Sequence, residues 1–317
     1  MVIDHSPDVV FHMGMHKTGS TSYQVALSRA RDELKARGVL YPHSIDGAVH
    51  PQQHADIARF VFNKRRKDLE EYFLSVKKEA AENNYRKIIF SAEAFSSLGN
   101  NQNFLNMFSD VVGEIFPGST YILVLRNAVD HLSSSLSEMI GGNSLHVNVS
   151  NFGEQVTNIL IYRATSIANL KNHLGSKMVL LDYSSLIVDG NLCSRLHGHI
   201  DIDTADLIDE VRLNVASEKD IFNLLTSCFR GILSVSINEP VYSQSVMNEL
   251  TRFVDLEVLR SALVPGAVSE FKNMYSAALK RVASEVVAEA MPRLLKVLSG
   301  LDESVLEYYV PGAAGKL

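Results

Sequence analysis

The stretch from Val9 to Thr21 constrains the fold of this chain most, because an apolar run leads into a glycine-bounded loop and then into a predicted helix. Val9–Met13 predicts a buried strand, and Gly14 and Gly19 bound the loop. Backbone N–H groups in such a loop, together with the unpaired N–H groups and the positive dipole end of the next helix, favour a phosphate-like anion. Lys17 adds a positive charge. The segment therefore predicts a strand, an anion-binding loop and a helix N-terminus.

The position of the lysine separates this loop from the Walker A pattern Gly-x-x-x-x-Gly-Lys-Ser/Thr. In that pattern the lysine follows the second glycine, and the next hydroxyl binds magnesium. Here Gly14 and Gly19 have the matching separation, but Ser20 follows Gly19 directly and Lys17 lies two residues before Gly19. This displacement argues against a site for a magnesium-bound nucleoside triphosphate.

The loop and a second motif resemble those of sulfotransferases that use 3′-phosphoadenosine 5′-phosphosulfate (PAPS). The 5′-phosphosulfate loop of that family reads Lys-Ser/Thr-Gly-Thr/Ser-Thr after a strand, and Lys17-Thr18-Gly19-Ser20-Thr21 matches it. The second motif is a strand ending in Leu-Arg-(Asn/Asp/Glu)-Pro-x-(Asp/Glu), with a serine eight residues after the arginine. Leu125-Arg126-Asn127-Ala128-Val129-Asp130 resembles it, and Ser134 has the right offset. Ala128 replaces the proline, which loosens the turn and removes no ligand.

The resemblance implies roles for these residues. It implies that Lys17 stands beside the bridging oxygen of the phosphosulfate, and that Arg126 and Ser134 hold the 3′-phosphate. It also implies an in-line, metal-free transfer of the sulfuryl group to a hydroxyl acceptor, with 3′,5′-adenosine bisphosphate (PAP) as product. We expect a carbohydrate or glycolipid acceptor. The residues expected at the 5′-phosphosulfate are His16, Lys17, Thr18, Gly19, Ser20 and Thr21.

A general base must take the proton of the acceptor hydroxyl, and Glu93 and His54 are the two candidates. Lys87–Ser91 predicts a short buried strand, so Glu93 stands just past a carboxyl end, where open α/β sheets bind ligands. The family carries its base at that place. His54 begins a short predicted helix after a turn-rich stretch. His50 and His54 could share a helical face, but no third ligand accompanies them, and we expect no metal site.

Short apolar runs alternate with helical periodicity over the first two thirds of the chain, which predicts an α/β fold with a doubly wound parallel sheet. The resemblance implies a P-loop-kinase-like sulfotransferase fold. We expect residues 1–220 to form the PAPS-binding core and residues 221–317 a helical extension packed on the same domain. Two roles stay open for the extension, namely covering the substrate side and forming a homodimer. Arg212–Ser217 resembles an asparagine-centred segment near the cofactor in bacterial members of the family.

Composition limits the partners of the chain. A net charge of −6 over 317 residues gives no general attraction to nucleic acid or to anionic membranes. Two cysteines, Cys193 and Cys228, indicate a reducing compartment. We expect no transmembrane segment, because no apolar run reaches about 18 residues, and no signal peptide, because the first strand begins near Val9. These features predict a cytoplasmic, bacterial enzyme.

Several alternatives stay open. Lys64–Lys67 is either a solvated basic face or a contact for an anionic acceptor. The whole chain could instead be a P-loop nucleotide-kinase-like enzyme, or a catalytically silent nucleotide-binding module. The acceptor itself is not encoded in either motif, because we expect its specificity to lie in the loops 43–66 and 141–151.

Overall fold

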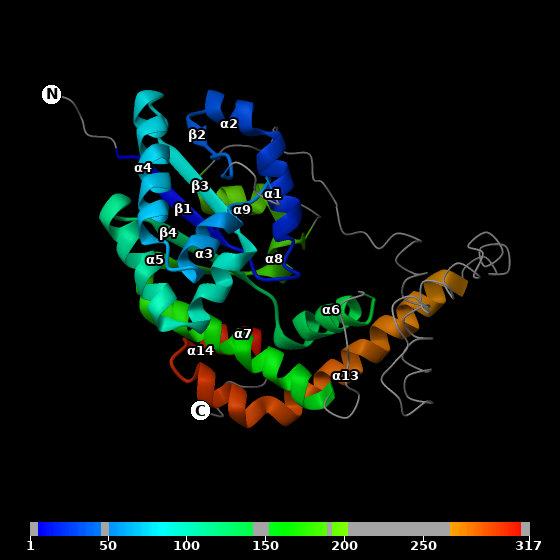
Figure 1. Ribbon diagram of the computed structural model, residues 1–317. Helices are drawn as coiled ribbons and strands as arrows, with labels where there is room; N and C mark the ends of the chain where they lie inside the picture. The colour runs from blue at the N-terminus through cyan, green and yellow to red at the C-terminus, as the bar shows by residue number, and fades with distance from the viewer. Residues whose placement is uncertain (1–5, 46–50, 142–151, 189–191, 202–266, 312–317) are drawn as a thin grey trace, which may run out of the picture. The chain divides into compact units, whose positions relative to one another are not determined.

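The chain contains a sheet of five parallel strands in the order β2-β3-β1-β4-β5 (Figure 1). A computed structural model describes residues 6–45, 51–141, 152–188, 192–201 and 267–311. The central strand, β1, pairs with β3 on one side and β4 on the other. The predicted parallel sheet is therefore confirmed. Its strands are β1 (Asp8–Met13), β2 (Val39–Leu40), β3 (Lys87–Ala92), β4 (Thr120–Leu125) and β5 (Met178–Asp182).

Helices connect the strands, as the alternating periodicity predicted. They are α1 (Ser20–Arg29), α2 (Arg31–Ala36), α3 (Ala55–Phe62), α4 (Arg66–Glu82), η1 (Glu93–Asn100), α5 (Gln102–Ile115), α6 (Ala128–Gly141), α7 (Phe152–Leu174), η3 (Gly175–Lys177), α8 (Tyr183–Leu186), α9 (Leu192–His199), α13 (Ala267–Leu298) and α14 (Glu303–Tyr309). Gly175, with φ at 56°, ends α7 in the left-handed conformation that glycine adopts at low cost.

Each face of the sheet has its own core. On one face Phe11 of β1 stacks on its register partners Phe90 and Tyr121, with ring centroids 4.9 and 5.5 Å away, and meets Phe73 of α4 and Phe108 of α5 edge-on. Because successive side chains in a strand point to opposite faces, the residues on either side of Phe11 in β1 point to the other face of the sheet. The members of that second core, which α1 and α9 help to form, include Val10, Tyr23, Leu27, Ile89, Ile122 and Leu196.

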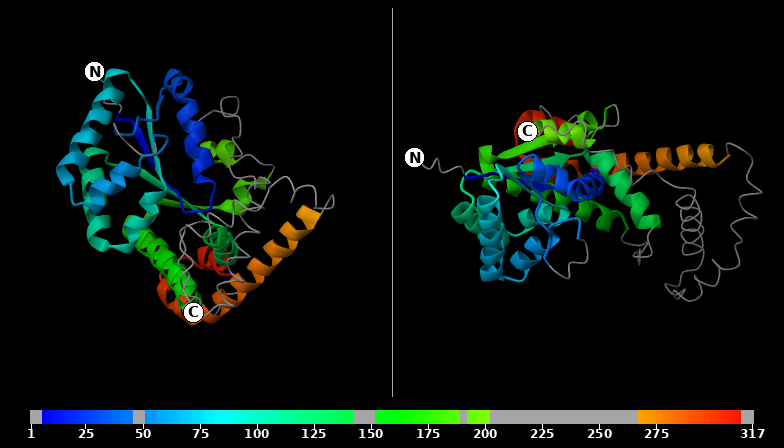
Figure 2. Two further views of the ribbon diagram at one scale, coloured as in Figure 1. Left: turned by 45° about the vertical axis from the view of Figure 1, so that its right-hand side comes forward. Right: turned by 90° about the horizontal axis from the view of Figure 1, so that it is seen from above.

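Helices therefore cover both faces of the sheet, and the doubly wound arrangement is confirmed (Figure 2). One connection differs from the periodicity read in the sequence. The apolar spacing of Tyr23, Leu27, Ala30 and Leu34 is that of one continuous helix up to Gly38, whereas α1 ends at Arg29 and α2 begins at Arg31. Ala30 between them has a ψ of 15°, although its N–H still bonds Ala26 O. The apolar spacing continues across this break, so periodicity alone could not detect it.

The chain divides into two compact units. The first comprises residues 1–127, 161–214 and 293–317 and contains the sheet; the second comprises 128–160 and 215–292. In the first unit α14 returns to the sheet, where Tyr308 Oη donates to the carbonyl of Leu125, the last residue of β4, at 3.1 Å. The predicted boundary at 220/221, the segment Arg212–Ser217, Cys228 and His50 lie outside the described residues. The 220/221 boundary stays a prediction.

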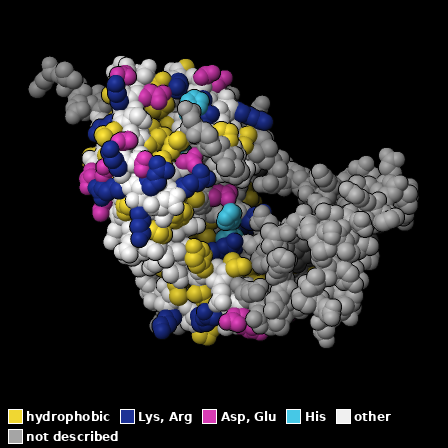
Figure 3. Space-filling model, viewed as in Figure 1, with side chains coloured by type: hydrophobic (Ala, Val, Ile, Leu, Met, Phe, Trp, Pro, Cys, Tyr) yellow, Lys and Arg dark blue, Asp and Glu magenta, His cyan; other side chains and the backbone are white. Residues whose placement is uncertain are grey.

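The basic cluster Lys64–Lys67 is largely neutralised by carboxylates. Arg65 pairs with Asp68 at 2.8 Å, and Arg66 pairs with Glu70 at 2.6 Å and with Glu114 at 2.8 Å. Lys67 lies 3.5 Å from Glu71. On the face drawn in Figure 3, basic and acidic side chains are likewise interspersed. These pairs favour the solvated-face interpretation.

Among the described helices, none has the apolar length needed to cross a membrane.

Candidate active site

The loop between β1 and α1 has the backbone of an anion site. Lys17 and Gly19 both adopt left-handed conformations, with φ of 66° and 75°. A left-handed residue beside a right-handed one turns successive backbone N–H groups toward one side, where they form a concave donor surface for anions. For lysine this conformation costs about 1–3 kcal/mol, and such strain concentrates at functional sites. Gly19 is the N-cap of α1, and among the described residues no side chain caps this helix and no acidic residue stands in its first turn.

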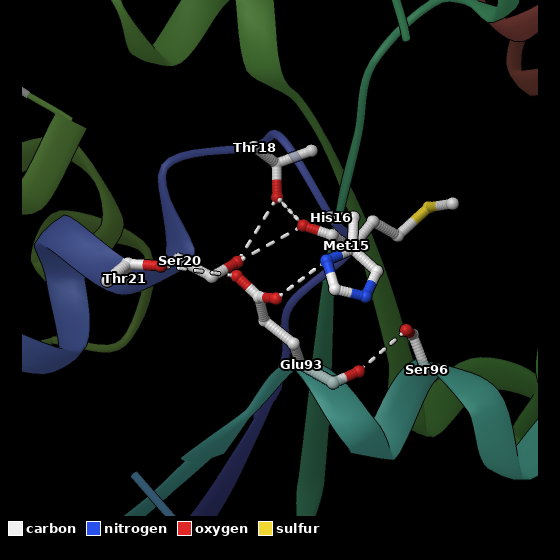
Figure 4. Close-up of polar contacts among 7 residues, drawn as sticks. All are labelled: Met15, His16, Thr18, Ser20, Thr21, Glu93 and Ser96. Atoms are coloured by element: carbon white, nitrogen blue, oxygen red, sulfur yellow. Dashed lines mark hydrogen bonds and ion pairs between the residues drawn. The ribbon is translucent and has the colours of Figure 1, made fainter. Parts of the chain in front are cut away.

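Two loop hydroxyls brace the loop from within (Figure 4). Thr18 Oγ1 donates to Met15 O at 2.7 Å, and Ser20 Oγ donates to the same carbonyl at 3.3 Å. Both side chains are buried. Their hydroxyls thus maintain the loop conformation, and the backbone N–H groups are left as the donors that suit an anion. Thr21, one residue further, donates instead to Glu93 Oε1 at 3.4 Å.

Gly14 allows the loop to close tightly on the sheet. Its N–H donates to Ala92 O of β3 at 3.2 Å, which continues the β1–β3 ladder by one residue. A Cβ at this position would lie 2.2 Å from Ser20 Oγ, 2.7 Å from Ser20 Cβ and 3.4 Å from Glu93 Cγ. The absence of a side chain at Gly14 therefore allows Ser20, the first residue of α1, and Glu93, the first residue after β3, to pack against the loop backbone.

We expect Gly14→Ala to lower the free energy of unfolding by about 1–3 kcal/mol, the usual effect of an overpacked interior position. Chemical denaturation of the purified variants measures this difference. Gly113→Ala in α5 is the matched control, because no described atom lies within 4 Å of a Cβ there, and we expect it to gain up to about 1 kcal/mol from helix propensity. Wild-type stability in Gly14→Ala would show that the loop has room for a side chain.

The structure brings Glu93 against the loop. Glu93 directly follows β3 and is the first residue of η1. Its Oε2 lies 2.9 Å from His16 Nδ1, and its side chain is 21% exposed. Ser96 Oγ donates to the Glu93 carbonyl at 2.8 Å, which fixes the first turn of η1 (Figure 4). A partly exposed carboxylate thus stands at the carboxyl edge of the sheet beside the loop between β1 and α1.

His54, the other candidate base, has a structural environment. Its Nδ1 accepts from the backbone N–H of Ser91 at 3.0 Å, and its Nε2 bonds the carbonyl of Pro42 at 3.0 Å. The side chain is buried, and this burial lowers the pKa of His54 to about 4 although both hydrogen bonds oppose the shift. His54 therefore ties the start of α3 to β3 and to the chain after β2. This environment favours a packing role, and the role of His54 as a base stays an untested prediction.

Arg126 reaches the loop from the end of β4. Its Nη1 donates to Lys17 O at 3.0 Å, and its guanidinium lies 5.2 Å from the ring centroid of Tyr183. Tyr183 also lines the loop, because its Cε2 would be 3.7 Å from a Cβ on Gly19. Tyr183 belongs to neither of the two sequence motifs. The signal that could have found it is its place directly after β5, at the edge where β1, β3 and β4 also end.

Ser134 lies in α6 and belongs to the second compact unit. Its side chain is partly exposed, whereas Leu132 and Leu136 on the same helix are buried. A joint role of Ser134 and Arg126 stays a prediction.

Among the described residues, no group of three or more His, Cys, Asp or Glu side chains is arranged to hold a metal ion.

Two solved structures of sulfotransferase domains are similar to this chain. The sulfotransferase domain from the curacin biosynthetic pathway shares 14% identity over 62% of this chain and 74% of its own, with a TM-score of 0.38. The sulfotransferase domain from the Synechococcus PCC 7002 olefin synthase shares 14% identity over 88% of this chain and 95% of its own, with a TM-score of 0.39. No family model and no curated protein matches the chain. We therefore infer function from the residues of the site.

Proposed function

We propose that this chain is a sulfotransferase that transfers a sulfuryl group from PAPS to a hydroxyl acceptor. The observation that carries the proposal is the hydrogen bond from Arg126 to the backbone of Lys17, 109 positions away in the sequence. It joins the two motifs on which the resemblance depends, at the carboxyl edge of the sheet. Glu93 meets the same loop through His16 and Thr21. Phosphosulfate-binding, 3′-phosphate-binding and proton-accepting groups would thus share one site.

The residues present suit the PAPS phosphates. The left-handed backbone at Lys17 and Gly19, and the uncapped first turn of α1, would offer N–H donors to the 5′-phosphosulfate. Lys17 would stabilise the charge that develops on the bridging oxygen as its bond to sulfur breaks. Arg126 would bind the 3′-phosphate, the group that distinguishes PAPS from adenosine 5′-phosphosulfate. Gly14 and Gly19 let Ser20 and Leu192 pack against the loop backbone, because a Cβ at Gly14 would lie 2.2 Å from Ser20 Oγ and one at Gly19 would lie 2.3 Å from Leu192 Cδ2.

The competing function is that of a P-loop nucleotide kinase, and ligand-induced stabilisation separates the two. PAP in the presence of EDTA should raise the thermal midpoint of the protein, because a ligand that binds only the native state stabilises it by mass action. Magnesium-ATP should raise it much less. Stabilisation by magnesium-ATP with no effect of PAP would reverse the assignment.

We further propose a glycan or glycolipid acceptor and a cytoplasmic homodimer.

Arg126→Ala should selectively weaken the binding of nucleotides that carry a 3′-phosphate. A charge-assisted hydrogen bond contributes about 1.5–3 kcal/mol, so the affinity for PAP should fall by about 10- to 150-fold. Adenosine 5′-phosphosulfate lacks the 3′-phosphate and should lose only what the bond to Lys17 O contributes. Ser134→Ala should show the same selectivity with a smaller loss. Calorimetric titration with both nucleotides measures the difference.

Arg65→Ala is the control for this pair of variants, because Arg65 is exposed and paired with Asp68 on α4. It should bind both nucleotides as the wild type does. Equal weakening of both nucleotides by Arg126→Ala would place the arginine away from the 3′-phosphate.

A further inference from the structure

His16 and Glu93 form a pair in which histidine is the outer member (Figure 4). The ring atom Nδ1 lies 2.9 Å from Glu93 Oε2, and the two side chains are 64% and 21% exposed. The other carboxylate oxygen, Oε1, accepts from Thr21 Oγ1. Both oxygens of Glu93 are thus engaged by the loop or by the start of α1, while the imidazole extends toward solvent.

Building on the proposed sulfotransferase function, on which this assignment depends, we infer that His16 and Glu93 act as a dyad in which His16 Nε2 accepts the proton of the acceptor hydroxyl. Glu93 accepts the hydrogen bond from Nδ1–H and so orients the ring. A carboxylate in this position fixes the tautomer whose Nε2 carries a lone pair, and it stabilises the imidazolium that forms. His16 is then a catalytic residue and Glu93 a positioning residue.

These groups account for both the proton and the leaving group of the transfer step. The acceptor O–H bond breaks and its proton moves to His16 Nε2, while the acceptor oxygen forms a bond to sulfur. The bond between sulfur and the bridging oxygen breaks, and its electron pair remains on the 5′-phosphate of PAP, beside Lys17. The imidazolium then releases the proton to water.

The environment of the pair favours histidine as the proton acceptor. An unperturbed imidazole titrates at about pH 6.5 and an unperturbed glutamate at about pH 4.3, so the imidazole is the better base at neutral pH. Glu93 from η1 faces the ring, and Lys17 is the next residue in the loop. In β1, burial lowers the pKa of His12 to about 4 against the opposing effect of Glu93, so His12 stays neutral and does not compete for the proton.

His16→Asn separates proton transfer from positioning. The asparagine amide N–H can replace Nδ1–H and keep the hydrogen bond to Glu93, but asparagine has no counterpart of Nε2. We expect kcat to fall by about 10²- to 10⁴-fold while PAP affinity and the thermal midpoint stay close to wild type. His16→Ala should be equally slow and should recover part of its rate when free imidazole is added.

A wild-type kcat in His16→Asn would overturn the dyad, because the base would then be Glu93 with His16 as its hydrogen-bond donor. The same conclusion would follow if imidazole failed to rescue His16→Ala. Failure of the proposed function looks different: the wild-type protein would then transfer no sulfuryl group from PAPS, and both the function and the dyad would fall.

NMR titration of the His16 ring in the PAP complex gives a readout independent of turnover. Because a neighbouring carboxylate favours the imidazolium, Glu93→Gln should lower the pH midpoint of the His16 ring. The resonance of the His16 ring is identified because it is missing from the spectrum of His16→Asn. An unchanged midpoint in Glu93→Gln would show that the two side chains do not interact in solution and would overturn the dyad.

Discussion

Lys17→Ala should lower kcat by about 10²- to 10³-fold while weakening PAP binding far less. The bridging oxygen gains negative charge only as its bond to sulfur breaks, so the ammonium group stabilises the transition state more than the bound nucleotide. The backbone of Lys17 has a left-handed conformation, and Arg126 holds it in place by donating a hydrogen bond to its carbonyl. In the proposed site most of the donors to the 5′-phosphosulfate belong to the backbone, so the substitution should leave them in place.

Steady-state rates together with calorimetric PAP titrations measure both parts of this prediction. Lys17→Met is the sharper variant, since it keeps much of the apolar stem and removes only the charge. Lys67→Ala is the control, because Lys67 is an exposed partner of Glu71 on α4. A kcat within a few-fold of wild type in Lys17→Met would mean that the lysine does not act on the leaving group.

Glu93→Gln should lower kcat by about 10²- to 10⁴-fold with PAP affinity nearly unchanged. The amide has the shape of the carboxylate but neither its charge nor its basicity, so it can neither take a proton nor stabilise an imidazolium at His16. Its contacts with Thr21 and His16 can still form in part, which is why we expect the fold to persist.

Initial rates over a range of acceptor concentrations separate kcat from KM for this variant. Glu114→Gln is the control, because Glu114 is an exposed partner of Arg66. An active Glu93→Gln together with a folded but inactive His54→Ala would transfer the proton-accepting role to His54.

Much of the fold could be predicted from the sequence, because parallel strands buried on both faces appear as short apolar runs. Phe11, Phe90 and Tyr121 lie in such runs, and their register pairing forms one core. The rule that ligand sites gather at the carboxyl edge then predicted that Glu93 and Arg126 lie near the loop. The break at Ala30 was missed, since the apolar spacing is the same on both sides of it.

The contacts within the site could not be predicted, because they depend on strand register and tertiary packing. Met13 pairs with Ala92, so the residues that follow each strand emerge side by side, and this brings His16 to Glu93. His54 is four positions from His50 in the sequence, but its partners are the backbones of Pro42 and Ser91. No local pattern encodes such long-range bonds.

Transfer of labelled sulfate from PAPS tests the central claim most directly. The wild-type protein is incubated with ³⁵S-labelled PAPS, EDTA, and glycan and glycolipid fractions of a cell extract, and labelled products are separated and identified by mass spectrometry. We predict that the wild type labels at least one hydroxyl-bearing product and that Lys17→Met labels it at least about 100-fold more slowly. If the wild type binds PAP but labels no fraction, the chain is a nucleotide-binding module and not a sulfotransferase.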